Sequence, residues 1–210
     1  MFKKLLDAYG SFFGLTHPLS KSLLLLCTLM HPVVGLMGVI GALSVLTSRK
    51  LLGFSGENEY VEVVNGLLLG MLFGSFYQCD AGAVCLTVIG GLLVVLVSAM
   101  LTETMTKHFR LPLLGLPYVV VAYLMLPFVQ YCPLLPAFPP PAAVIPDLHN
   151  AALDWLSPLG AIYFNGTAAG GLIVLLALAV SSRYLAALGL MSCMMLTALL
   201  NMLAVPDLLL

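Results

Sequence analysis

Apolar residues fill long uninterrupted runs of this chain, and charged residues occur mainly at the ends of those runs. The charge-free stretches are Ser22–Ser48, Val63–Cys79, Ala81–Thr102, Leu111–Pro146, Trp155–Ser182 and Tyr184–Pro206. A helix that spans a membrane needs about 20 mostly apolar residues, and most of these stretches reach or exceed that length. The pattern therefore predicts an all-α, polytopic membrane protein.

Basic residues indicate which helix ends face the cytoplasm, because Lys and Arg are enriched on that side. The basic markers are Lys3, Lys4, Arg49, Lys50, Lys107, Arg110 and Arg183. Asp80 separates two apolar stretches, and His31-Pro32 predicts a turn because the residue before a proline avoids helical torsions. Five crossings are predicted before the proline-rich segment, at Phe12–Met30, Val33–Thr47, Val63–Cys79, Ala81–Thr102 and Leu111–Phe128.

Sequence similarity indicates an internal repeat, and the odd number of crossings predicts that its second copy is inverted. The run Pro18–Leu43 resembles Ala168–Met194 at a spacing of about 150 residues, and an odd number of crossings would insert the second copy upside down. We predict a first membrane repeat at 1–132, a proline-rich linker at 133–153 and the start of a second repeat at 154–210. The fold class is a polytopic helical membrane protein with an inverted-topology repeat.

Composition excludes several other classes of protein. Charged residues make up 8% of the chain and hydrophobic residues 61%, whereas a soluble domain carries about 25% charged residues. A net charge of −1 gives no footprint for nucleic acid. The cysteines and histidines share no metal-ligand spacing and no nucleophile motif occurs, so we expect no cofactor, no metal and no enzyme; a membrane enzyme ranks last among the alternatives.

The segment Leu111–Tyr118 contains two prolines with a glycine between them. Such a segment interrupts a helix, and irregular backbone at membrane depth is tolerated only where protein or a water-filled cavity satisfies the freed groups. Two interpretations remain open: a discontinuous helix that lines a solute path, or a kinked helix packed on its neighbours.

Several short motifs resemble the urea transporter family. Leu111-Pro112-Leu113-Leu114-Gly115-Leu116-Pro117-Tyr118 resembles that family's L-P-x-x-T-x-P-F segment, and Val64-Asn65-Gly66-Leu67-Leu68 its aromatic-Asn-Gly-x-Leu element. Gly160-Ala161-Ile162-Tyr163-Phe164-Asn165 stands where the family has G-Q-V-F-F-Q, and Thr16-His17-Pro18-Leu19-Ser20 is similar to its N-N-P-L-S. The resemblance covers most of the chain, with the motifs in the expected order.

The resemblance implies downhill, channel-like transport of urea or a similar small neutral polar solute. In that family, paired aromatic rings sandwich the solute, and oxygens along broken helices accept its N–H groups. It further implies a multi-pass protein of the cell membrane and a homotrimer with one pore per subunit. The substrate-binding residues that it suggests are Phe164, Asn65, Leu68, Tyr118, Ala161 and Gly115.

This chain departs from the family's pattern at several of these positions. The pore Gln or Glu falls on Ala161 and, in the first half, on Ser11. A slot aromatic falls on Gly14, although Phe164 keeps its counterpart, and the motif threonine is Gly115. The motifs therefore predict a pore for a small polar solute more firmly than they identify that solute as urea.

Three intramembrane polar residues have alternative explanations. Asn65 and Asn165 could face a solute or could bond a carbonyl of a neighbouring helix. Lys21 lies within an apolar run, where we expect its long stem to reach an interface.

A second functional alternative is a polytopic protein without transport activity. The second repeat's equivalents of Asn65-Gly66 and Leu111-Pro112 would fall beyond Leu210. We therefore expect a partial transporter that is inactive alone or depends on a partner, with the backbone at Gly115 and Pro117 lacking partners.

Overall fold

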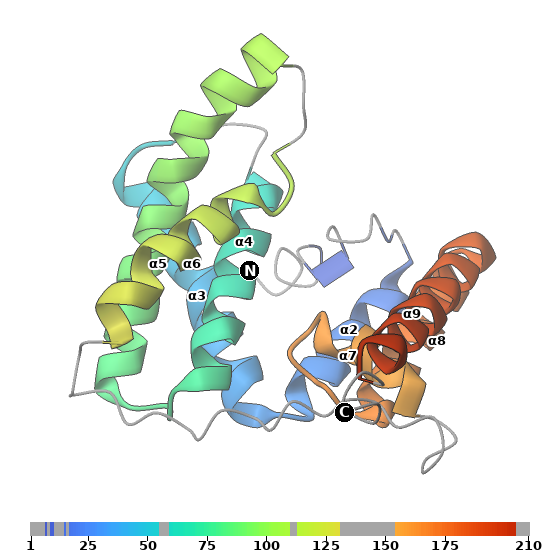
Figure 1. Cartoon of the computed structure of the whole chain (residues 1–210). Coiled ribbons are helices and arrows are strands. Elements are labelled where there is room, and N and C mark those ends of the chain that lie inside the picture. The colour runs from blue at the N-terminus through green and yellow to red at the C-terminus, as the bar shows by residue number, and fades with distance from the viewer. Residues whose placement is uncertain are drawn as a thin grey trace. The chain divides into compact units, whose positions relative to one another are not determined.

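The described part of the chain is helical throughout. The computed structural model describes residues 7, 9–10, 15, 17–54, 59–109, 113–130 and 154–204, and no β-strand occurs among them. Figure 1 shows the helices, which fall into two compact units. The first unit is Met1–Gly14 with His31–Pro140, and the second is Leu15–Met30 with Pro141–Leu210. Each is described by itself.

The first unit begins and ends its helices near the predicted breaks. Its elements are α3 (Pro32–Leu51), α4 (Glu59–Phe76), α5 (Ala81–Leu101), the π-helical continuation η1 (Thr102–Phe109) and α6 (Leu116–Gln130). His31 is the N-cap residue of α3, with Pro32 in the first turn, where a missing N–H is not needed. Asp80 caps α5, and its carboxylate accepts a hydrogen bond from the Ala83 N–H at 2.7 Å. The turns predicted at His31-Pro32 and Asp80 are thus confirmed.

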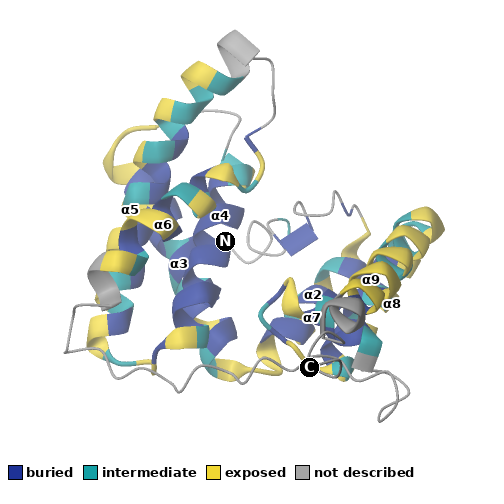
Figure 2. Ribbon diagram, in the orientation of Figure 1, coloured by how far each residue is buried: buried dark blue, intermediate teal, exposed yellow. Residues whose placement is uncertain are grey.

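Glycines allow α3 and α4 to pack with their backbones in contact. A Cβ added at Gly41 would lie 2.1 Å from the carbonyl oxygen of Gly66, and one at Gly70 would lie 2.1 Å from that of Met37. Small residues permit this approach, which gives dispersion contacts that larger side chains would prevent. Figure 2 shows the buried residues concentrated on these two helices within the unit.

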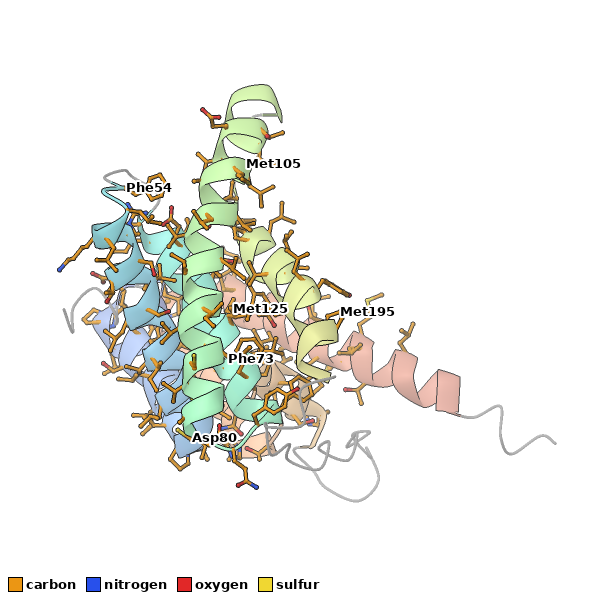
Figure 3. All side chains as sticks on the ribbon, turned by 90° about the vertical axis from the view of Figure 1, so that its left-hand side faces the viewer. Phe54, Phe73, Asp80, Met105, Met125 and Met195 are labelled. Atoms are coloured by element: carbon orange, nitrogen blue, oxygen red, sulfur yellow. The ribbon has the colours of Figure 1, made fainter. Side chains whose placement is uncertain are left out.

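α5 packs against the same pair and also against α6. A Cβ at Gly91 would clash with the Ser44 hydroxyl of α3 at 1.7 Å. On the neighbouring face, a Cβ at Gly90 would lie 2.6 Å from Leu69, 3.2 Å from the Met125 sulfur and 3.5 Å from the Phe73 ring. Phe73 and Met125 lie beside the same stretch of α5 in Figure 3.

An ion pair joins the last turn of α3 to the first turn of α4. Arg49 Nη1 donates to the Glu62 carboxylate, and both side chains are buried. Because this pair neutralises the Glu62 charge, α4 can include this buried residue ahead of the charge-free stretch that predicted the helix.

The second unit combines one early helix with the C-terminal helices. Its elements are α2 (Pro18–Leu29), η2 (Asp154–Leu156), α7 (Ser157–Ala161), α8 (Ala168–Ser181) and α9 (Arg183–Ala204). α2 packs against α8 in this unit, so the compact units differ from the predicted division at 1–132 and 154–210, which concerns sequence repeats and stays a prediction. Lys21 lies in the first turn of α2, close to the end of the helix.

α2 and α8 bury corresponding positions. Adding 150 to the numbers of the buried residues of α2 (Ser20, Leu24, Cys27 and Thr28) gives Gly170, Val174, Ala177 and Leu178, which are all buried in α8. The same offset relates the N-cap residues, His17 of α2 and Thr167 of α8. The sequence similarity therefore coincides with a similarity in packing.

Two of the described helices are long and apolar enough to cross a membrane, Pro32–Leu51 and Ala81–Met105. The shorter apolar helices are Pro18–Leu29, Leu116–Pro127, Ala168–Ser181 and Arg183–Leu199. The number of crossings stays a prediction. The predictions that involve Ser11, Phe12, Gly14 and the linker 133–153 concern residues outside the described part of the chain.

Candidate functional site

The proline-rich motif forms a break before α6. Leu113 has no regular secondary structure, and Leu114 and Gly115 form a turn. Helical structure begins at Leu116, whose N–H bonds the Leu113 carbonyl at 3.1 Å. Pro117 occupies the first turn of α6, where no intrahelical N–H bond is lost. Leu114 has a positive φ of 40°, which costs a non-glycine residue about 1–2 kcal/mol. Residues 110–112 lie outside the described part.

The side-chain amide of Asn65 bonds the backbone on both sides of this break. Asn65 Nδ2 donates to the Leu114 carbonyl at 2.8 Å and to the Val61 carbonyl at 2.7 Å. Its Oδ1 accepts the N–H of Tyr118 at 2.9 Å. Asn65 is fully buried, so the alternative in which it bonds neighbouring backbone is the one observed.

The expectation that this backbone lacks partners is wrong for the carbonyls of Leu114 and Gly115 and for the Tyr118 N–H. Asn65 supplies one bond on each side of Gly115 and Pro117, and the Gly115 carbonyl accepts the Val119 N–H at 3.2 Å. These groups are satisfied from within the first unit because α4 passes beside the break. A second wall is not required for these bonds.

The other predicted residues of the first unit differ in their exposure. Gly115 and Tyr118 are partly exposed, whereas Leu68 is buried on α4, one turn beyond Asn65. Nothing lies within 4 Å of a Cβ built on Gly115. Asn65, Gly115 and Tyr118 thus come together at the break, with open space beside the glycine.

In the second unit, Ala161 and Phe164 share a tight turn after α7. The Phe164 N–H bonds the Ala161 carbonyl at 2.9 Å, and the Asn165 N–H bonds the Gly160 carbonyl at 3.1 Å. Phe164 has a φ of 56°, which is uncommon for a large aromatic residue. Ala161 is exposed and Phe164 partly exposed, so both side chains can be reached.

Asn165 ties this turn to α2. Its Nδ2 donates to the Cys27 main-chain carbonyl at 3.0 Å, and its Oδ1 accepts the Thr167 hydroxyl at 2.7 Å. The Thr167 hydroxyl in turn accepts the Gly170 N–H at 3.0 Å and caps α8. The roles of Cys27 and Thr167 were missed from the sequence, although a threonine directly before an apolar helix is a capping signal that could have indicated the second.

The chemistry of these two turns suits a neutral polar solute. The side chains there are amide, hydroxyl and aromatic groups, and the nearby main-chain carbonyls are hydrogen-bond acceptors. Within the described ranges, no three His, Cys, Asp or Glu residues gather to hold a metal ion.

Comparison with known proteins supplies the family. A model of the urea transporter family matches residues 2–207, which is nearly the whole sequence. No curated protein matches the chain significantly. The motifs, the apolar helices and this match agree, and the chain belongs to the urea transporter family, integral membrane channels whose activity is the facilitated transport of urea.

Proposed function

We propose that the solute of this channel meets the break at Leu113–Tyr118 and the turn that contains Phe164. The observation that carries this proposal is that a buried asparagine stabilises each segment. Asn65 bonds the Leu114 carbonyl in the break, and Asn165, directly after Phe164, bonds the Cys27 carbonyl on α2. Because these amides are already bonded to protein, the solute contacts fall to exposed or partly exposed neighbours. These are Gly115 and Tyr118 in the first unit and Phe164 and Ala161 in the second.

Urea fits such groups. It is planar and neutral and carries four N–H donors, so it loses its water only where acceptors replace that water. The Phe164 ring would pack against the flat face of urea, and the Tyr118 hydroxyl would supply polarity at the break. Asn65 and Leu68 act behind the surface, because both are buried.

Two departures from the family's motifs should lower the affinity for the solute. Ala161 cannot accept an N–H as a Gln or Glu would, and Gly115 lacks the hydroxyl of a threonine. A permeable path with low affinity and broad selectivity among small planar amides is the expected result.

We further propose five crossings before the linker, an inverted second repeat, residence in the cell membrane and a homotrimer. The offset of 150 between the buried positions and N-caps of α2 and α8 supports the repeat. Arg49 and Lys50 in the last turn of α3 suit a cytoplasmic helix end.

The deciding experiment is solute flux in vesicles that contain the purified chain. Vesicles placed in hyperosmotic urea shrink and then reswell if the protein conducts urea. Phe164→Ala should slow reswelling by about threefold to tenfold, the factor that corresponds to the loss of an aromatic contact. The matched control is Tyr184→Ala, since Tyr184 is an exposed aromatic residue of the same unit, outside the turn.

Three outcomes would count against this proposal. Folded wild-type protein that gives no flux would favour a non-transporting membrane protein. Equal effects of Phe164→Ala and Tyr184→Ala would remove Phe164 from the site. A loss of flux in proportion to a loss of protein abundance would mark Phe164 as a packing residue.

A further inference from the structure

Phe164 stands in a turn that has little support of its own. α7 is only five residues long, and the turn that follows it closes with short-range bonds from Phe164 and Asn165. The positive φ of Phe164 must be maintained by its surroundings, because an isolated chain would leave that region. A long-range contact is therefore needed to fix the ring.

Asn165, directly after Phe164, makes that contact. Its Nδ2 reaches the Cys27 carbonyl on α2, a residue 138 positions away in the chain. The amide is oriented by the Thr167 hydroxyl on its Oδ1, and the side chain is fully buried.

Glycines around Asn165 restrict what else could stand there. A Cβ at Gly170 would lie 2.6 Å from the Asn165 side-chain carbon, and one at Gly160 would lie 2.2 Å from the Asn165 carbonyl oxygen. Gly170 thus packs closely on the side-chain amide and Gly160 on the main chain of Asn165, which leaves this residue little freedom to move.

We propose that Asn165 is a positioning residue, which sets the orientation of the Phe164 ring through the Cys27 main-chain carbonyl and thereby sets selectivity among small planar amides. This inference rests on the proposed role of Phe164 at the solute site. Asn165 touches no solute in this scheme; it fixes the turn from behind.

Asn165→Asp is the sharpest substitution. It keeps the shape and the acceptor for the Thr167 hydroxyl but replaces the donor to the Cys27 carbonyl by an oxygen. Thr167→Ser retains both of its hydrogen bonds and is one control. Cys27→Ser retains the main-chain carbonyl and a donor toward the Gly170 carbonyl, and is the other.

Two measurements on the full chain in vesicles test the proposal. The first is the rate at which a water-soluble maleimide labels Phe164→Cys, with and without Asn165→Asp, quantified at that site by mass spectrometry. The second, with Phe164 intact, is the ratio of urea to methylurea permeability. We expect Asn165→Asp to change the labelling rate and the permeability ratio by about fivefold each, the factor that corresponds to one typical hydrogen bond. Thr167→Ser and Cys27→Ser should change neither quantity.

The results separate this inference from the proposed function. An unchanged labelling rate at position 164 would overturn the positioning role, whatever the flux does. An equal change of the labelling rate in Cys27→Ser would mean that the effect comes from packing around Cys27. It would also overturn the positioning role of Asn165. Unaltered flux in Phe164→Ala would instead show that Phe164 does not contact the solute. The labelling rate would still test whether Asn165 positions residue 164.

Should Asn165→Asp fail to fold, Thr167→Val replaces it. This variant removes the hydroxyl that orients the amide and that also caps α8, and it leaves the Asn165 donor in place, so a smaller change in labelling in the same direction is expected. No change would contradict the inference.

Discussion

Asn65 and Leu114 lie 49 positions apart in the sequence, yet the amide of the first donates to the carbonyl of the second at 2.8 Å. Leu114 and Phe164 are the non-glycine residues with positive φ among those that the structure describes. Each is accompanied by a buried asparagine that bonds main chain on another element, Asn65 across to the break and Asn165 across to α2. The two amides stabilise backbone that regular helices cannot satisfy.

Replacing Asn65 should therefore destabilise the first unit strongly. Asn65→Leu leaves the part-buried Leu114 carbonyl and Tyr118 N–H without these partners, and an unsatisfied group costs about 1–3 kcal/mol where water does not reach it. We expect a loss of roughly 2–4 kcal/mol, measured by thermal unfolding in detergent. The control is Ser75→Ala on the same helix, whose hydroxyl bonds only the Leu72 carbonyl. Equal stability of the two variants would contradict the role of Asn65.

A hydroxyl at position 115 should strengthen solute binding. Gly115 has ordinary φ, and open space surrounds its Cβ position, so Gly115→Thr can be accommodated without strain. The hydroxyl adds an acceptor for the N–H groups of urea at the break. We expect urea permeability to rise or half-saturation to fall in Gly115→Thr, measured by vesicle reswelling. Gly115→Val has the same shape without the hydroxyl, and an equal gain there would refute the explanation.

A methyl group added at Gly70 should disrupt the contact between α3 and α4 and destabilise the protein. A Cβ at that position would lie 2.1 Å from the Met37 carbonyl oxygen, so the two helices must separate. Overpacking of this kind costs about 1–3 kcal/mol. Gly166→Ala is the control, because nothing lies within 4 Å of its Cβ position. Protease resistance in detergent should fall for Gly70→Ala alone; a stable Gly70→Ala protein would show that the helices do not pack this closely.

The sequence predicts the helix ends that local interactions determine. His31-Pro32 and Asp80 mark helix ends through proline geometry and carboxylate capping, which depend only on near neighbours. The grouping of α2 with α8 depends on contacts between segments distant in the chain, and apolar periodicity does not specify partners in a uniformly apolar sequence.

The candidate site was predictable in its residues but not in their roles. Asn65 and Asn165 stand out because an amide is rare in apolar runs, yet nothing in the sequence tells whether the amide faces a solute or a carbonyl. The partner of Asn165 is the main chain of Cys27, and main-chain acceptors leave no mark in the sequence. The partner of Glu62, by contrast, is a side chain that could have been sought among the few basic residues.

The Arg49–Glu62 pair should show strong coupling between its members. Removing one partner leaves a buried charge uncompensated, which costs about 3–5 kcal/mol, whereas replacing both by apolar residues costs much less. We expect Arg49→Met and Glu62→Leu each to destabilise more than the double variant, measured by chemical unfolding in detergent. Lys50→Gln is the control, because Lys50 neighbours Arg49 and is exposed. Additive effects in the double variant would mean that the pair carries no coupling.

The two ends of the first unit should face opposite sides of the membrane. Phe54, just after α3, and Asp80, just before α5, lie at opposite ends of the unit in Figure 3, with α4 running between them. If α4 crosses the bilayer, native Cys79 and a cysteine introduced by Leu51→Cys must face opposite compartments, since both positions are exposed.

An impermeant maleimide added to one side of sealed vesicles should therefore label one position and not the other, once Cys85 and Cys132 are replaced by serine. The buried Cys27 and Cys193 serve as an internal control, because they should react only after denaturation. Labelling of Cys79 and position 51 from the same side would mean that α4 does not span the membrane. The five-crossing topology would then fail, and with it the inversion of the second repeat, because that inversion requires an odd number of crossings before the linker.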